Sequence, residues 1–190
     1  MGKAVCAGIA ISIGCIANLV AGNKLVGSVL FGVGLLAVCV HGFTLFTGTV
    51  CRVSGTRESI IFNAKTLFLN AVGVVIAAVI FGMSNIDTNV MTLVANKIAE
   101  SPLEIIGKAM FCNILICIAV DEWKEQKNSL MVLFPVTVFV FCGFEHCIAN
   151  LFYMLAAKTF SITFFFWNVI GNAIGGIMFW RFKHFSTTND

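Results

Sequence analysis

The chain has 190 residues, of which 59% are hydrophobic and 11% are charged, with a formal net charge of +3. Soluble domains carry roughly a quarter charged residues, so this composition excludes an ordinary soluble protein and indicates an integral membrane protein. The small positive charge lies at the ends of apolar segments, and it gives no indication of nucleic-acid binding.

Six apolar runs follow one another along the chain, and each is about as long as a helix that crosses a bilayer. They cover residues 4–20, 25–43, 67–83, 103–120, 130–150 and 160–182. We interpret the first run as a retained helix rather than a cleaved signal peptide, because five more follow it. We therefore expect an all-α membrane protein in which residues 1–190 form a single transmembrane channel domain.

Basic residues are divided unequally between the two sets of helix ends. One set carries Lys3, Arg52, Arg57, Lys65, Lys124, Lys127, Arg181 and Lys183, whereas the other carries Lys24, Lys97 and Lys158. Loops rich in Lys and Arg stay on the cytoplasmic side. With six spans, this predicts a multi-pass protein of the inner, cytoplasmic membrane with both termini in the cytoplasm.

The chain contains eight cysteines, and no two of them form a CxxC pair. Most fall within the apolar runs, where a thiol packs as a small apolar group. The spacing typical of a zinc site is also absent from the sequence. We expect the cysteines to serve packing rather than metal or disulfide chemistry, and we expect no cofactor.

The six runs divide into two halves of three, approximately 1–96 and 97–190. An odd number per half inverts the second half in the membrane, which is the plan of many transporters and channels. The second and fifth runs each contain Gly-Phe followed by a polar residue, at Gly42 and at Gly143. Glycine lets a backbone leave the helix, and irregular backbone at membrane depth must be buried or line a cavity. We therefore expect both helices to be broken around a pore.

Few ionisable side chains fall within the apolar runs. Glu145, His146 and His41 do so, and Lys97 and Glu100 lie just before the fourth run. An ionised side chain at the bilayer centre costs at least about 2.5–3.5 kcal/mol, which makes it a functional candidate. Imidazole exchanges a proton near neutral pH, so we interpret His146 as a pore residue and His41 as a structural histidine. Glu145 is expected to accept hydrogen bonds from backbone N–H groups freed at the break.

Several stretches resemble the formate/nitrite transporter family. They are KLVGSVLFGVGLL (24–36), LFTGT (45–49), CNILICIAV (112–120), GFEHCIAN (143–150) and GNAIGG (171–176). The resemblance implies an aquaporin-like bundle of six helices that assembles as a homopentamer in the lipid bilayer, with a pore in each subunit. It also implies transport of small monovalent anions and their conjugate acids, such as formate, nitrite and hydrosulfide.

The same resemblance implies roles for individual residues. His146 matches the central histidine, a proton relay, with Thr47 facing it and Glu145 beside it. Asn113 and Asn150 match asparagines that offer hydrogen bonds in the pore.

Lys97 matches a vestibule lysine that attracts the anion. Two hydrophobic constrictions are matched, the outer by Phe31 and Phe139, the inner by Leu35, Leu45 and Phe46. Thr44 stands where the family usually has an acidic residue, and only Met1, Gly2 and Lys3 precede the first run, so we do not expect a long N-terminal gating segment.

These observations predict passive or proton-coupled transport of small anions or weak acids, and not an enzyme. The neutral acid is the cheaper species to move through an apolar constriction, whereas conduction of the bare anion past a cationic His146 is the competing mechanism. An aquaporin-like channel for neutral solutes is a second hypothesis, although the chain lacks two Asn-Pro-Ala motifs. A haem enzyme that uses His41 and His146 as axial ligands is a third.

Overall fold

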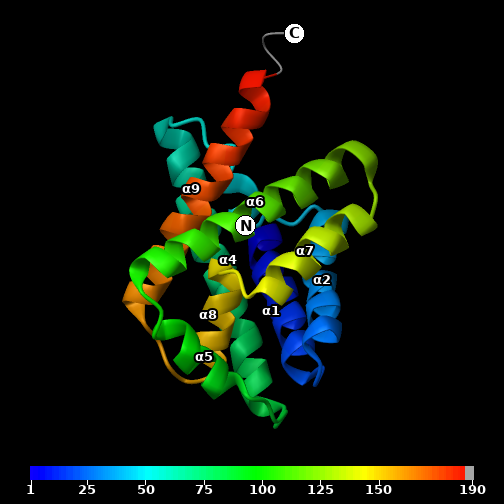
Figure 1. Ribbon diagram of the computed structural model, residues 1–190, viewed down its shortest axis with the longest axis vertical. Helices are drawn as coiled ribbons and strands as arrows, with labels where there is room; N and C mark the ends of the chain where they lie inside the picture. Colours follow the sequence, from blue (N-terminus) through cyan, green and yellow to red (C-terminus); the bar gives the residue numbers. More distant parts are fainter. Residues whose placement is uncertain (187–190) are drawn as a thin grey trace.

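The computed structural model describes residues 1–186, and within that range the regular structure is entirely helical (Figure 1). The helices, in chain order, are α1 Gly2–Val20, α2 Lys24–His41, α3 Phe46–Val50, α4 Arg57–Met83, α5 Val90–Ile98, α6 Pro102–Gln126, α7 Leu130–Cys142, α8 Cys147–Ala156 and α9 Ile162–Ser186.

Five of the described helices, α1, α2, α4, α6 and α9, are individually long and apolar enough to cross a membrane. The sixth span is the pair α7 and α8, which bend by 54° at the break between them. Figure 1 shows α7 and α8 as two separate helices joined by a short connection. Large apolar side chains remain exposed on the outer faces, as Leu103 and Phe68 illustrate. Such surfaces are stable against lipid, so the predicted all-α membrane protein is confirmed.

Helix ends follow capping chemistry more closely than hydropathy. The third apolar run begins at residue 67, but α4 starts at Arg57, because the Thr56 side chain accepts a hydrogen bond from the Ser59 amide. In α6, Ser101 and Glu104 form a reciprocal capping box around Pro102. The short helix α5 was not expected, because its nine residues are too few to form an apolar span.

The two predicted breaks are present at equivalent places. Gly42 ends α2 and Gly143 ends α7, with φ angles of +60° and +72°. Residues with a Cβ atom rarely adopt this left-handed backbone conformation, which explains why glycine is present at both positions. In each case an amide just after the helix donates a hydrogen bond to a carbonyl in its last turn. Phe43 N–H donates to the Val38 carbonyl, and Phe144 N–H donates to the Phe139 carbonyl.

One buried asparagine holds the first break. The Asn70 side chain on α4 accepts a hydrogen bond from the Phe46 amide and donates to the carbonyls of Ala4 and Thr44. Backbone groups freed inside a membrane need such partners, because lipid offers none.

A second buried asparagine holds the other break in the same way. Asn172 on α9 accepts a hydrogen bond from the Cys147 amide and donates to the carbonyls of Ala109 and Glu145. Each asparagine therefore joins the start of a half-helix to the chain just before it and to a neighbouring span.

The halves correspond element by element. In the first, α1 packs against α2 and α4; in the second, α6 packs against α7 and α9. The halves meet where α2 contacts α7 and where α4 contacts α8. The predicted inverted 3+3 repeat with broken second and fifth spans is confirmed, and it brings α3 and α8 together in the interior.

Candidate functional site

His146 and Thr47 meet where the two broken spans converge. The His146 Nε2 atom lies 3.0 Å from the Thr47 Oγ1 atom, although the residues are 99 positions apart in the chain. Both are buried, with 2% and 0% of their surfaces exposed. The imidazole also stacks on Phe139, with ring centroids 6.0 Å apart. The sequence predicted that these two residues face each other, and the structure brings them together.

The second ring nitrogen of His146 has a structural partner. Nδ1 accepts a hydrogen bond of 3.1 Å from the amide of Ala149, because His146 is the N-cap of α8. A nitrogen that accepts carries no proton, so the ring is neutral in this arrangement and its hydrogen is on Nε2. The Nε2–H group therefore donates to Thr47, and the Thr47 hydroxyl can donate its own hydrogen to a third group.

A cavity of about 370 Å³, called the outer cavity because it contains the residues matched to the outer constriction, is lined by His146 but not by Thr47. Phe31 and Phe139 line it and contact each other edge to face, with centroids 5.6 Å apart. Both are almost fully buried, as expected for a narrow apolar ring. His146 lines the same cavity, and its imidazole stacks on the Phe139 ring.

Lys97, Glu145 and Asn150 form a network on the wall of the outer cavity. The Lys97 ammonium lies 2.7 Å from both carboxylate oxygens of Glu145, and the Asn150 amide donates to one of them at 2.6 Å. Glu145 is fully buried. Its carboxylate was expected to bind freed backbone N–H groups, but the structure gives it side-chain partners, because Asn172 already serves the backbone at the break.

A second cavity of about 250 Å³ lies at the other end of the bundle. Leu45, Gly48 and Arg52 line it together with Lys124 and Lys127, and it shares no lining residue with the outer cavity. Of the other inner-constriction residues, Leu35 and Phe46 are both buried and line neither cavity.

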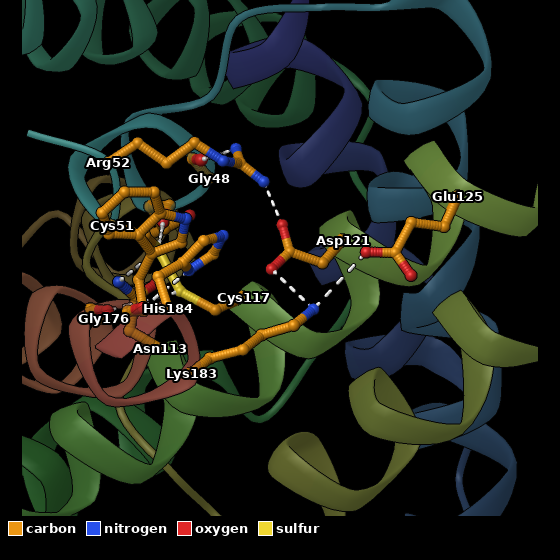
Figure 2. Close-up of polar contacts among 12 residues, drawn as sticks. Gly48, Cys51, Arg52, Asn113, Cys117, Asp121, Glu125, Gly176, Lys183 and His184 are labelled. Carbon is orange, nitrogen blue, oxygen red and sulfur yellow. Dashed lines mark hydrogen bonds and ion pairs between the residues drawn. A yellow bond between two sulfur atoms is a disulfide. The ribbon is translucent and has the colours of Figure 1, made fainter. Parts of the chain in front are cut away.

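Asn113 lies beside a covalent link that was not expected. Its amide nitrogen donates to the Asn172 carbonyl at 2.8 Å and approaches the Cys51 sulfur at 3.6 Å, while its Oδ1 has no hydrogen-bond partner among the described residues. Cys51, at the end of α3, forms a disulfide with Cys117 on α6 (Figure 2). The expectation that the cysteines only pack is wrong for this pair, because the fold brings together two residues 66 positions apart.

The structure separates the two histidines of the haem hypothesis. His41 is exposed and stacks on Phe43, with ring centroids 5.3 Å apart. His146 is buried and bonded through both nitrogens. The pair therefore does not form the facing axial ligands that a bis-histidine haem requires.

Sequence reasoning missed Asn70 and Asn172, although a signal was present. Both stand in the third span of their half, within the related stretches NAVG (70–73) and NAIG (172–175). A polar side chain repeated at corresponding places in two apolar helices indicates a shared structural role.

The fold defines an integral membrane protein built from an inverted repeat, and comparison with known proteins shows its family. The family model described as "Formate/nitrite transporter" matches residues 1–185. The chain belongs to the formate/nitrite transporter family.

Relatives of this family include several curated bacterial proteins. "Formate channel FocA" of Haemophilus influenzae is 34% identical over 149 residues, which are 68% of this chain and 52% of that protein. "Uncharacterized transporter YrhG" of Bacillus subtilis is 30% identical over 183 residues, which are 83% of this chain and 69% of the relative. This chain therefore spans about half to two thirds of the length of these relatives.

Solved structures share the fold. A structure described as "Pentameric formate channel with formate bound" superimposes with a TM-score of 0.85 at 21% identity, over 99% of this chain and 96% of the other. An "FNT family ion channel" gives a TM-score of 0.86 at 20% identity, over 98% and 88% of the two chains.

Proposed function

We propose that the chain transports small monovalent weak acids, of the formate, nitrite and hydrosulfide class, by a path from the outer cavity past His146 and Thr47 to the second cavity. The observation that carries this proposal is the buried imidazole–hydroxyl pair at the meeting of two broken spans. Ionisable and polar side chains are rare in the apolar interior of a membrane protein and are functional candidates there, and here the imidazole stacks on one of the two phenylalanines of the outer cavity. The names of the curated relatives support the same substrate class.

Attraction of the anion requires a positive charge that is not already compensated. Lys97 was expected to provide it, but Glu145 holds its ammonium, and Lys108 on the same cavity pairs with Glu100. Among the described residues, Lys24 has no carboxylate within ion-pairing distance; its Nζ lies over the Phe141 ring, 4.9 Å from the centroid. In our proposal, Lys97 contributes by fixing Glu145, and Lys24 gives the outer cavity its net positive charge.

Passage of the neutral acid fits this site better than passage of the bare anion. Removing a carboxylate-sized anion from water costs several kcal/mol even after partial compensation. A cationic His146 would need a proton on Nδ1, where the Ala149 amide already donates. The sequence-based proposal of a proton relay through His146 would therefore disrupt the cap of α8 in each cycle. We propose instead that the anion takes its proton from hydronium ions of the solution that enters the outer cavity, so that the amount of neutral acid follows the bulk pH.

His146 and Thr47 then act as hydrogen-bond donors to the passing acid. Nε2–H orients the Thr47 hydroxyl, whose hydrogen is available to the carbonyl oxygen of an acid between the two cavities. Asn113 Oδ1, a buried acceptor with no partner among the described residues, can receive the hydrogen of an acid O–H group. Neutral donors and acceptors of this kind offset the loss of water without favouring a charged form.

We further propose that the end with Arg52 and Lys183 faces the cytoplasm, in keeping with the distribution of basic residues. Assembly as a homopentamer is proposed on two grounds: the structurally similar formate channel is described as pentameric, and apolar side chains are exposed on the outer faces of this chain.

A transport panel tests the proposal. The purified protein is reconstituted into vesicles, and uptake of formate, nitrite, hydrosulfide, acetate and lactate is followed across a pH series. We expect uptake of the smaller acids to rise as the pH falls. Absence of uptake for the whole panel would reject the substrate class.

Two substitutions of His146 separate a donor from a relay. Glutamine keeps an N–H donor at a similar reach but does not titrate, whereas phenylalanine removes the donor. The donor role predicts that His146→Gln retains most of the pH-dependent flux and that His146→Phe loses it. If both variants are correctly folded and lose flux to the same extent, the result would favour a proton relay through His146.

One observation favours a second candidate, a channel for small neutral solutes. The ion pairs of Lys97 and Lys108 and the neutral His146 leave no uncompensated charge at the His146–Thr47 pair itself. Vesicle swelling in glycerol distinguishes the two: rapid swelling without uptake of any acid would favour the neutral-solute channel.

A further inference from the structure

The short helix α3 is fixed to its surroundings at both ends. Near its start, the Phe46 amide donates to Asn70, and Thr47 contacts His146. At its end, Cys51 is bonded to Cys117 of α6, and the next residue, Arg52, pairs with Asp121 (Figure 2). The disulfide is the one covalent attachment of this five-residue helix to another span among the described residues.

We propose that Cys51 and Cys117 form a reversible oxidation site that controls the mobility of α3 and, through it, passage between the two cavities. The control of flux rests on the proposed function, whereas formation of the cross-link is measured independently of transport. The position of the pair supports a regulatory role, because Cys51 lies four residues after Thr47, one helical turn away, and contacts Asn113.

A carbonyl oxygen lies beside each sulfur of the pair. The Cys51 sulfur lies 3.1 Å from the Thr47 carbonyl oxygen, and the Cys117 sulfur lies 3.8 Å from the Gly176 carbonyl oxygen. After reduction, each new S–H group can therefore donate to a carbonyl that is already in place. The reduced pair would therefore find hydrogen-bond acceptors already beside it.

The location of the pair favours reversibility over permanent cross-linking. Arg52 and Asp121 connect the cysteine pair to Lys183, within the end that we propose faces the cytoplasm (Figure 2). Cytoplasmic thiol pools keep most cysteines reduced, and disulfides that form there are usually transient. In the proposed orientation, the channel would have thiols in a reducing cytoplasm and a disulfide under oxidising stress.

The chemistry is thiol–disulfide exchange with a low-molecular-weight disulfide. Both cysteines are almost fully buried, so the exchange requires that α3 first move away from α6. The thiolate of one cysteine then attacks the small disulfide, forms a mixed disulfide and releases one small thiolate. The second cysteine then attacks the protein sulfur of the mixed disulfide and releases the other. Two protein thiols are oxidised, one small disulfide is reduced to two small thiols, and an excess of small thiol reverses both steps.

The expected direction is that oxidation slows transport. The two cavities share no lining residue, and Leu35, Phe46 and Thr47 are buried and line neither of them. Phe46 and Thr47 belong to α3, and Leu45 directly precedes it. A solute can pass only if these side chains move, and a covalent link at Cys51 restrains the helix that carries them.

The experiment uses the reconstituted protein with glutathione disulfide or glutathione added to one side of the vesicles at a time. Thiols are then counted by maleimide labelling of the denatured protein and mass spectrometry. Of the eight cysteines, six are free when the disulfide is present. We expect six labels after oxidation and eight after reduction. Eight labels after oxidation from either side would overturn the proposal.

Formate uptake and hydrogen exchange of the α3 amides are measured on the same samples. Oxidation should reduce uptake and slow exchange, and glutathione should reverse both. Cys51→Ser and Cys117→Ser should each behave like the reduced protein in either reagent, whereas Cys6→Ser, which alters an exposed thiol on α1, should respond like the unaltered chain.

The outcomes separate this inference from the proposed function. Six labels with unchanged uptake and unchanged exchange would mean that the cross-link is only structural, which would overturn the inference. No uptake in any state would reject the proposed function, while the label count and the exchange of α3 would still decide whether oxidation immobilises this helix.

Discussion

Replacing Asn172 tests how the second broken span is held. Its fully buried side chain bonds the Ala109 and Glu145 carbonyls and the Cys147 amide. Leucine has the same branched arrangement of four side-chain heavy atoms, although it is bulkier, and it leaves these three backbone groups buried without partners. Each such group costs about 1–3 kcal/mol, and partial relaxation reduces the sum. Asn172→Leu should therefore lower the free energy of unfolding by about 3–6 kcal/mol.

Asn168 provides a matched control one turn earlier on the same helix. It is also fully buried, but neither its Oδ1 nor its Nδ2 atom has a hydrogen-bond partner among the described residues. Asn168→Leu should therefore leave the stability unchanged or raise it by about 1–3 kcal/mol. Asn70 makes the equivalent hydrogen bonds at the first break, so Asn70→Leu should lower the free energy of unfolding by about as much as Asn172→Leu.

Thermal unfolding in detergent, followed by circular dichroism, compares the three variants, and formate uptake reports on the pore. We expect the midpoint to fall for Asn172→Leu and Asn70→Leu but not for Asn168→Leu. Equal midpoints for Asn172→Leu and Asn168→Leu would refute the reasoning, because burial of an amide alone would then explain both.

Three further predictions concern the pore. Lys97→Gln leaves the Glu145 carboxylate buried without a counter-charge, so it should lower the free energy of unfolding by about 3–5 kcal/mol. The double variant Lys97→Gln with Glu145→Gln removes both charges and should recover most of this loss, as measured by thermal unfolding. Lys24→Gln should raise the KM for formate about threefold at low salt with Vmax unchanged, while Lys24→Arg should match the parent; a fall in Vmax alone would contradict an attracting role. Thr47→Val removes both the acceptor of the buried His146 Nε2–H group and the donor to the acid, so it should reduce uptake at least about tenfold. Thr47→Ser keeps the hydroxyl and should retain uptake. Similar uptake in both variants would exclude a role of the hydroxyl in transport.

The spans and breaks were predictable because they depend on local chemistry. A bilayer demands long apolar runs, and the left-handed ends of α2 and α7 demand glycine at 42 and 143. His146 was identifiable because an ionisable group in an apolar run is rare. Its contact with Thr47 was implied only by resemblance, since nothing local relates residues 99 positions apart.

The partners of the polar side chains were less predictable, because they depend on tertiary contacts. Lys97 and Glu145 are 48 positions apart, and their pairing changes the first from an attracting charge to a structural one. The link between Cys51 and Cys117 likewise requires that α3 lie against α6. Sequence spacing predicts neither contact. The repeated NAVG and NAIG stretches, in contrast, did indicate the shared structural role of Asn70 and Asn172.

The most direct test of the pore measures formate uptake and electrical current together in vesicles, at a fixed formate gradient and stepwise lower pH. A path that passes the neutral acid between a neutral imidazole and a hydroxyl predicts that uptake rises as the pH falls while almost no net charge crosses the membrane. Uptake that ignores pH and carries about one charge per formate would contradict it.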